Sequence, residues 1–268
     1  GGELSRLPPV GNAPRPRPGA PVFPLRDDNP TELAPFMTLV VLALCVAAWF
    51  LLQGAGFSVE ALTTSVCTWG AIPAEITGAQ GGSGPCRLGG LTWEALVTSM
   101  FLHGSWMHLI GNLWFLWIFG NNVEDSMGHG RFVVFYLVTG LAAALAHVLL
   151  NTGSAVPMVG ASGAISGVMG AYLLLYPRAR VHTLFFFIFF VRVVPLPAWV
   201  LLGYWMLLQV AGLGAAATVG GGVAYAAHVG GFLAGIALIP FFSRQTLVQA
   251  KRSDRVLDRR ELDRGGWW

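Results

Sequence analysis

The stretch GASGAISGVMGAYLLLY, residues Gly160–Tyr176, decides the fold of this chain. Its small residues recur at helical spacing, with Gly163, Gly167 and Gly170 at positions i, i+4 and i+7. Such a bare face suits close packing between membrane helices. Ser162 stands at the start of the predicted helix, where backbone N–H groups are free and carry a partial positive charge. The stretch therefore predicts a buried helix with a polar group in its first turn.

The composition indicates a membrane protein. Hydrophobic residues make up 54% of the 268 residues and charged residues only 11%, with a mean hydropathy of +0.63. A soluble domain would carry about 25% charged residues, so a lipid bilayer must cover this surface. We expect an all-α, polytopic membrane protein with a bundle of six transmembrane helices. The predicted spans are Pro35–Gly54, Trp106–Gly120, Phe132–Leu150, Ser162–Tyr176, Leu196–Gly212 and Ala224–Phe242.

A seventh apolar segment, Thr183–Val191, is too short to cross, because a helix of this length covers only about 14 Å. We interpret it as part of an interfacial loop. With six spans and a cytoplasmic N-terminus, every Lys and Arg except Arg87 lies on the cytoplasmic side. The positive-inside rule favours this topology. The sequence pI of about 9.0 then reflects membrane orientation, and no nucleic-acid partner is needed to explain it.

The chain divides into three predicted parts. Residues 1–31 are rich in Pro, Arg and Gly and indicate a flexible cytosolic arm. Residues 32–242 form the membrane domain, with a long outer loop at about 55–104, and residues 243–268 form a basic cytosolic tail. The Gly- and Ala-rich segment 212–222 is a candidate mobile cap.

The cysteines differ in their surroundings. Cys67 and Cys86 both lie in the outer loop and could pair in an oxidising compartment. Two free thiols are the alternative, and the sequence leaves both open. Cys45 lies in the first span as a small apolar residue. No cluster of further ligands accompanies the cysteines, so we expect no metal site.

A second polar residue, His228, lies near the outer end of the last span. Ala227, Gly231 and Gly235 form a small-residue face on that span, and if it meets the glycine face after Ser162, His228 can approach the serine. Both spans run from outside to inside, which puts the two side chains at similar depth. No Asp or Glu lies in any predicted span, so a Ser–His dyad is the chemistry available. Ordinary helix packing is the alternative reading of the same pattern.

The second span supplies His103, His108 and Asn112. His108 and Asn112 share a helix face, and both side-chain types can donate hydrogen bonds to an oxyanion. Roles in the membrane interface and in helix packing are the alternatives. A zinc site that adds His228 is conceivable, but no HExxH pattern or acidic ligand supports it. The other polar and aromatic span residues we interpret as structural: His147, Trp199, Tyr204, Trp205 and Gln209.

Three motifs occur in order on these spans: HGSWMHLIGN (His103–Asn112), GASG (Gly160–Gly163) and AHVGGFLAG (Ala227–Gly235). With them the chain resembles, from about residue 24 to residue 242, the rhomboid family of intramembrane serine proteases. The resemblance implies a six-helix core with a nucleophile, Ser162, and a general base, His228.

The resemblance also implies an oxyanion site made by His108, Asn112 and the Ser162 backbone N–H, supported by Gly160 and Gly163. Two departures stand out. Many relatives have a Trp-Arg pair in the first outer loop, where this chain has Trp93-Glu94. Some relatives stack a Tyr from one turn after the serine on the histidine, where this chain has Ser166, so helix packing must hold the imidazole.

By this resemblance we expect a serine endopeptidase that cleaves single-span membrane proteins near the outer face and needs no cofactor. Its expected location is the plasma or inner membrane of a bacterium. A rhomboid-like protein that binds clients without cutting them is one alternative, against which both dyad residues argue. A small transporter is another, but no charged cluster lies in mid-membrane.

Overall fold

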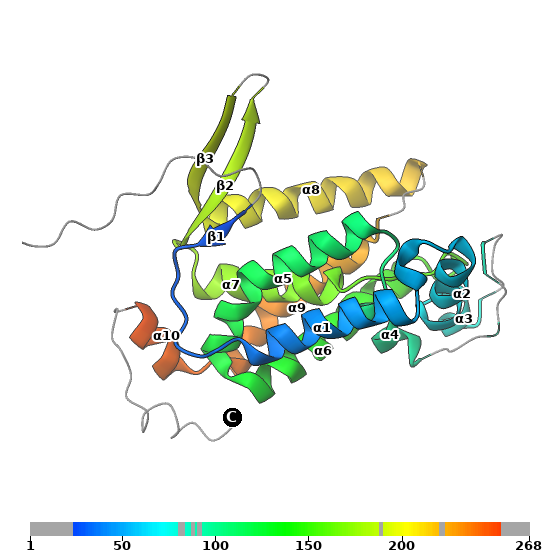
Figure 1. The fold of residues 1–268 in the computed structure, drawn as a ribbon, viewed down its shortest axis with the longest axis horizontal. Helices are drawn as coiled ribbons and strands as arrows, with labels where there is room; N and C mark the ends of the chain where they lie inside the picture. The colour runs from blue at the N-terminus through cyan, green and yellow to red at the C-terminus, as the bar shows by residue number, and fades with distance from the viewer. Residues whose placement is uncertain are drawn as a thin grey trace, which may run out of the picture.

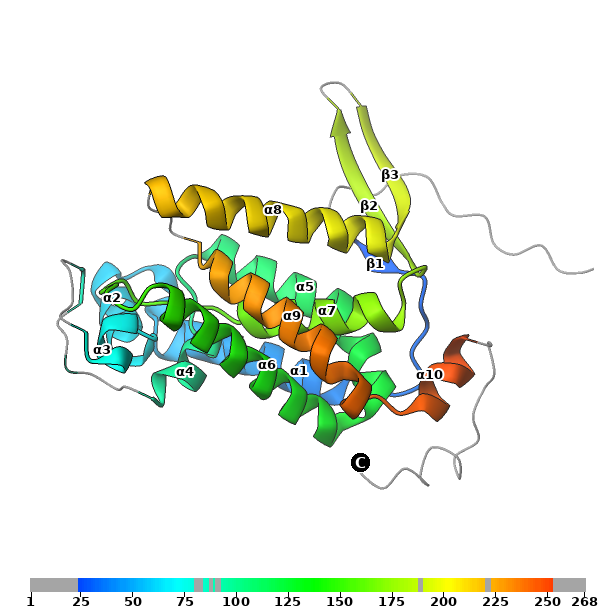
Figure 2. The ribbon, with the colours of Figure 1, turned by 180° about the vertical axis from the view of Figure 1, so that it is seen from behind.

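The computed structural model describes residues 24–79, 84–86, 89, 93–187, 190–219 and 223–252. A long helix coincides with each predicted span, and these helices form the bundle in Figures 1 and 2. Their bounds are α1 Phe36–Leu51, α5 Trp106–Met127, α6 His129–Leu150, α7 Ser162–Leu175, α8 Ala198–Val219 and α9 Tyr225–Phe242. Short helices α2 (Val59–Trp69), α3 (Pro73–Thr77) and α4 (Ala95–Thr98) lie at one end of the bundle, and α10 (Gln245–Arg252) lies at the other.

Two helices among the described residues, His129–Leu150 and Tyr225–Phe242, are long and apolar enough to cross a membrane. Three shorter apolar helices accompany them, Phe36–Leu51, Ser162–Leu175 and Ala198–Gly214. Large apolar side chains remain exposed around the bundle, including Leu207 on α8 and Leu233 on α9. Because water does not tolerate so much exposed apolar surface on a stable monomer, these helices have the character of a membrane domain.

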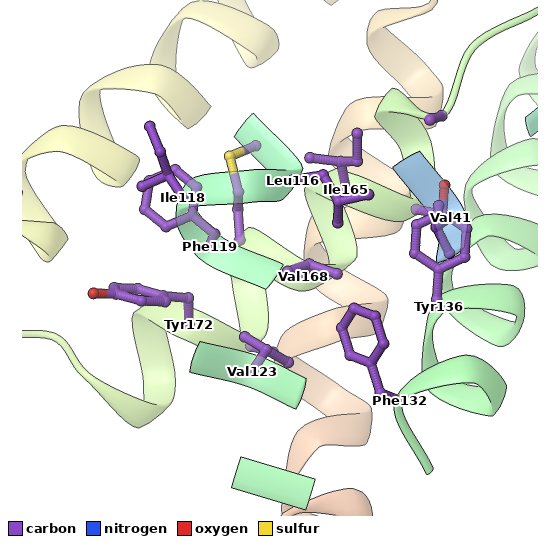
Figure 3. Close-up of a cluster of buried hydrophobic side chains, with 14 of the residues drawn as sticks. Val41, Leu116, Ile118, Phe119, Val123, Phe132, Tyr136, Ile165, Val168 and Tyr172 are labelled. Carbon is purple, nitrogen blue, oxygen red and sulfur yellow. The ribbon is translucent and has the colours of Figure 1, made fainter. Parts of the chain in front are cut away.

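Helix α7 lies at the centre and contacts α5, α6 and α9. Its apolar side chains join those of α5 and α6 in one buried cluster, in which Phe119, Phe132 and Val168 are fully buried (Figure 3). Where α7 and α9 face each other, the contact is made by glycines, so no side chains separate the two backbones. A Cβ at Gly231 would lie 2.1 Å from the carbonyl oxygen of Gly163, and a Cβ at Gly235 would lie 2.0 Å from that of Gly167. The two small-residue faces predicted from the sequence therefore meet, backbone against backbone.

This contact makes Gly235→Ala strongly destabilising. The new methyl group would collide with a backbone oxygen that no rotamer change can move, and overpacking typically costs about 1–3 kcal/mol. Gly203→Ala on α8 is the matched control, since nothing lies within 4 Å of its Cβ position and alanine favours a helix by about 1 kcal/mol. Thermal unfolding in detergent should show a lower Tm for Gly235→Ala and an equal or higher Tm for Gly203→Ala. Equal Tm values for wild type and Gly235→Ala would contradict the packing.

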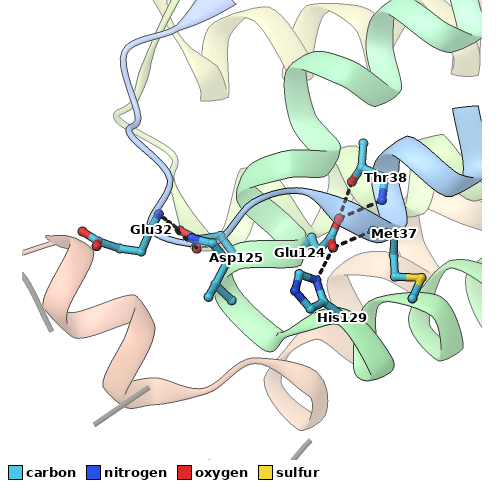
Figure 4. Close-up of polar contacts among 7 residues, drawn as sticks. Glu32, Met37, Thr38, Glu124, Asp125 and His129 are labelled. Atoms are coloured by element: carbon cyan, nitrogen blue, oxygen red, sulfur yellow. Dashed lines mark hydrogen bonds and ion pairs between the residues drawn. The ribbon is translucent and has the colours of Figure 1, made fainter. Parts of the chain in front are cut away.

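Helix α5 extends past the predicted end of the span at Gly120, and this extension carries two buried carboxylates that the sequence analysis placed outside the spans. Glu124, fully buried, accepts hydrogen bonds from the backbone N–H groups of Met37 and Thr38 at the start of α1 (Figure 4). Asp125 accepts from the backbone N–H groups of Glu32 and Leu33. A helix N-terminus offers free donors and positive charge, which stabilises the Glu124 carboxylate, and the Nδ1 of His129 contacts the same carboxylate at 2.5 Å.

A small antiparallel sheet stands beside the bundle as a local addition to the predicted all-α fold. Strand β2 (Arg180–Phe187) pairs with β3 (Phe190–Pro197), and β1 (Arg26–Asp27) pairs with the other edge of β2. The described residues of the segment interpreted as an interfacial loop, 183–187 and 190–191, are paired in this hairpin, which projects away from the helices in Figure 1. Its Val, Thr and Phe residues favour extended backbone, and the two prolines of β3 exclude a helix there.

Residues 24–31, predicted as the end of a flexible arm, are instead bound to the bundle. The indole N–H of Trp114 donates to the carbonyl oxygen of Pro24 at 2.7 Å. The carboxylate of Asp27 accepts from Asn122 and from the hydroxyl of Tyr172. The rest of the arm, residues 1–23, lies outside the described residues, as do residues 253–268 of the tail. Residues 212–219 of the candidate cap continue α8, and 220–222 are not described.

The predicted outer loop contains helices α2 to α4 and a disulfide between Cys67 and Cys86. Ser58 caps α2 by accepting a hydrogen bond from the backbone N–H of Ala61. Of the two alternatives that the sequence left open, the structure has the bridge. Cys45 is a free thiol buried between helices.

The bridge can be tested with a membrane-permeant thiol reagent. In native membranes we expect no labelling of Cys67 or Cys86 until a reductant is added. Cys45 is the internal control, because its burial (1% exposed) should protect it both before and after reduction. Immediate labelling of Cys67 and Cys86 in untreated membranes would show that the thiols are free.

Candidate active site

Ser162 lies in the first turn of α7 and follows a loop whose backbone is hydrogen-bonded to two other segments of the chain. Met158 and Ala71 exchange a pair of backbone hydrogen bonds of 2.8 and 3.0 Å, and the Gly160 N–H donates to the carbonyl oxygen of Ser99 at 2.9 Å. Gly160 has a φ of +127°, which side-chain-bearing residues rarely adopt. The loop thus fixes where α7 begins, and the first N–H groups of α7 have no intrahelical partner.

His228 lies about one turn into α9, on the side that faces Ser162. Its Nε2 is 2.8 Å from the Ser162 Oγ, and both residues are half-buried. The glycine contacts between α7 and α9 permit this approach, since Gly231, about one turn after His228, lies against Gly163, the residue that follows Ser162. A separation of about 2.6–3.2 Å is what proton transfer from a nucleophile to its base requires.

His108 stands next to this pair, beside Gly160. A Cβ at Gly160 would lie 2.6 Å from the Nε2 of His108, so the imidazole edge lies close against that backbone. The His108 Nδ1 is 3.3 Å from the backbone nitrogen of Gly104, whose N–H can only donate. Nδ1 is then the acceptor, and in the neutral imidazole the hydrogen is on Nε2. His108 therefore directs a donor towards the loop that precedes Ser162.

Asn112 follows His108 by one helical turn and is 6% exposed. Within the described ranges, its Nδ2 has no hydrogen-bond partner. Leaving a buried donor unpaired costs about 1–3 kcal/mol, and active sites are where such a cost is met. His108 and Asn112 thus share a face of α5, as the sequence predicts, and offer two donors there.

His103, which the sequence analysis grouped with them, has a different place. It is fully buried in the loop before α5, and Gln53 clamps its backbone through hydrogen bonds of 2.6 and 2.9 Å. Burial, with a smaller effect of His108, lowers the pKa of His103 to about 3. Its ring centroid lies 5.2 Å from that of His108, edge to face. The neutral ring of His103 therefore packs against the ring of His108.

Two residues that the sequence analysis interpreted as structural contact the His228 imidazole. The Gln209 Oε1 lies 2.8 Å from the Nδ1 of His228, and the Trp205 ring lies 5.8 Å from the His228 ring. Ser166 does not reach His228; its hydroxyl donates to the carbonyl oxygen of Ser162 within α7. The sequence does contain a signal for Gln209, because a polar amide side chain stands there among apolar residues of the same predicted span.

No group of three or more His, Cys, Asp or Glu side chains in the described part of the chain is arranged to hold a metal ion. The groups that converge at this site are the Ser162 hydroxyl, the imidazoles of His228 and His108, and several N–H donors. This set can deprotonate a nucleophile and stabilise a negatively charged oxygen.

Comparison with known proteins matches the region that contains this site. The family model described as the Rhomboid domain matches residues 90–245. The chain is 30% identical over 162 residues to "Rhomboid protein 1, mitochondrial" of Saccharomyces cerevisiae, covering 59% of this chain and 44% of the relative. It is 34% identical over 139 residues to "Rhomboid protease GluP" of Bacillus subtilis, covering 52% of this chain and 24% of the relative.

A shorter match is 42% identical over 83 residues to "Rhomboid-like protein 11, chloroplastic" of Arabidopsis thaliana, covering 31% of this chain and 29% of the relative. The chain thus spans less than half the length of each of these curated relatives.

Proposed function

Because this chain belongs to the rhomboid family of membrane proteins, which includes the rhomboid protease GluP, we propose that it is an intramembrane serine endopeptidase with Ser162 as nucleophile and His228 as general base. One observation carries the proposal. The Ser162 Oγ and the His228 Nε2 lie 2.8 Å apart inside a helical bundle.

In the proposed reaction the Ser162 hydroxyl gives its proton to the Nε2 of His228 while its oxygen attacks the scissile carbonyl. The resulting oxyanion is stabilised by the first N–H groups of α7, the Nε2–H of His108 and the Nδ2–H of Asn112. His228 then protonates the leaving amine, and a water molecule, deprotonated by His228, hydrolyses the acyl-enzyme.

The proposed topology has six spans with both termini in the cytoplasm. It is supported by the fold: β1, the β2–β3 hairpin and α10 gather at one end of the bundle, and α2 to α4 lie at the other (Figure 1). Arg26, Arg180 and Arg192 lie in the strands at the first end, which is where the positive-inside rule places cations. The dyad then opens towards the outer face of a plasma or inner membrane, in a bacterium.

The proposed substrates are single-span membrane proteins whose helix unwinds near the outer face. Gly and Pro lower the cost of that unwinding by about 1 and 3 kcal/mol per residue relative to Ala, so cleavage should prefer spans that contain them.

Purified protein in liposomes, given a panel of single-span substrates, tests the function. We expect cleavage that stops when a fluorophosphonate modifies the serine. Fluorophosphonate labelling without cleavage of any substrate would favour a client-binding protein, and absence of both would contradict an assembled dyad.

A further inference from the structure

Gln209 is an unusual residue in its surroundings. It lies on α8 among apolar and aromatic residues and is only 8% exposed. An uncompensated amide in an apolar environment is costly, and buried polar side chains nearly always have hydrogen-bond partners. The partners of Gln209 should therefore explain why an amide is present.

The first partner orients the amide. The Gln209 Nε2 donates to the backbone carbonyl oxygen of Trp205, one turn earlier, at 3.2 Å. A carbonyl oxygen can only accept, so the NH2 end of the amide must face it. The other end, Oε1, then faces the Nδ1 of His228 at 2.8 Å.

The second partner determines where the imidazole carries its hydrogen. Because the amide oxygen can only accept, the His228 Nδ1 must be the donor. In the neutral ring Nε2 is then unprotonated, and its lone pair points to the Ser162 Oγ 2.8 Å away. Only this tautomer can take the serine proton. The opposite tautomer would place a hydrogen on Nε2 and could not act as the base.

We propose that Gln209 is a positioning residue for the dyad. The proposal rests on the function proposed above. By accepting a hydrogen bond from the Nδ1–H of His228, Gln209 holds this histidine in the tautomer that can act as a base. In Ser-His-Asp enzymes a carboxylate does this and also stabilises the imidazolium. The neutral amide does the first without adding a charge within the membrane. Trp205, one turn away on the same helix, lies against the imidazole ring and limits its rotation.

The test compares three variants of this chain, residues 1–268, in liposomes. Gln209→Leu removes the acceptor, Gln209→Glu keeps an oxygen acceptor, and Leu207→Ala is a control on the exposed side of α8 (64% exposed). Acid–base catalysis by a positioned group contributes about 10²–10⁴-fold, so we expect Gln209→Leu to lower kcat about 100-fold with KM within about twofold. Gln209→Glu should recover most of kcat, and Leu207→Ala should match wild type.

The tautomer itself is read from the ¹⁵N NMR signals of His228, assigned by their loss in His228→Ala. Wild type should show a protonated Nδ1 and an unprotonated Nε2, a measurement that needs neither cleavage nor a folded Gln209 variant. A protonated Nε2 in neutral wild type, or wild-type kcat in Gln209→Leu, would overturn the inference. If wild type shows the expected tautomer yet cleaves no substrate, the hydrogen bond that fixes the His228 tautomer stands and the proposed function fails.

Discussion

Ser162→Ala and His228→Ala should each abolish cleavage while the protein stays folded. The two side chains are 2.8 Å apart and act as one unit, so the loss of either costs nearly as much as the loss of both. In a serine protease this loss amounts to roughly 10⁶-fold in kcat. The measurement is the rate of substrate cleavage in liposomes, with Tm as the test of folding.

Ser166→Ala is the matched control, because Ser166 lies on the same helix one turn later and its hydroxyl donates to the Ser162 carbonyl oxygen. It should retain cleavage within about tenfold, since a single neutral hydrogen bond contributes only about 0.5–1.5 kcal/mol. Fluorophosphonate should label wild type and Ser166→Ala, and not Ser162→Ala. Substantial cleavage by Ser162→Ala would rule out Ser162 as the nucleophile.

Asn112→Ala and His108→Ala should slow cleavage without abolishing it. Removing one oxyanion donor typically costs about 2.7–4 kcal/mol, or 100- to 1000-fold in kcat. The backbone N–H groups at the start of α7 still hold part of the charge, so residual activity is expected. Because Ser162 and His228 are intact, fluorophosphonate should still label the serine in both variants.

His103→Ala provides the comparison for this pair. His103 contacts the ring of His108 and its backbone is clamped by Gln53, so its loss should act indirectly and cost less than the loss of His108. Wild-type rates in both Asn112→Ala and His108→Ala would show that α5 is only a scaffold and that the oxyanion is held elsewhere.

The positions of the long helices follow from the sequence because each has its own apolar run. The ends are less predictable. Helix α5 continues through Glu124 and Asp125, two charged residues that in the sequence suggest a loop. In the structure, backbone N–H groups at the start of α1 and just before it donate hydrogen bonds to both carboxylates. Strand β1 was missed because its pairing with β2 joins residues far apart in the chain, Arg26 with His182. The β2–β3 hairpin is a local pairing, in which Phe187 faces Phe190, and its short apolar run was interpreted as a loop.

The sequence by itself determined the membrane character, the helices and the two small-residue faces that carry Ser162 and His228. These are properties of composition and of helical spacing, and both are local. Only the tertiary structure decided that the faces meet at backbone contact, that Gly104 leaves the hydrogen of His108 on Nε2, and that Gln209 faces the Nδ1 of His228. Hydrogen-bond direction depends on which atoms approach within about 3 Å, and no spacing within one helix specifies the partner on another.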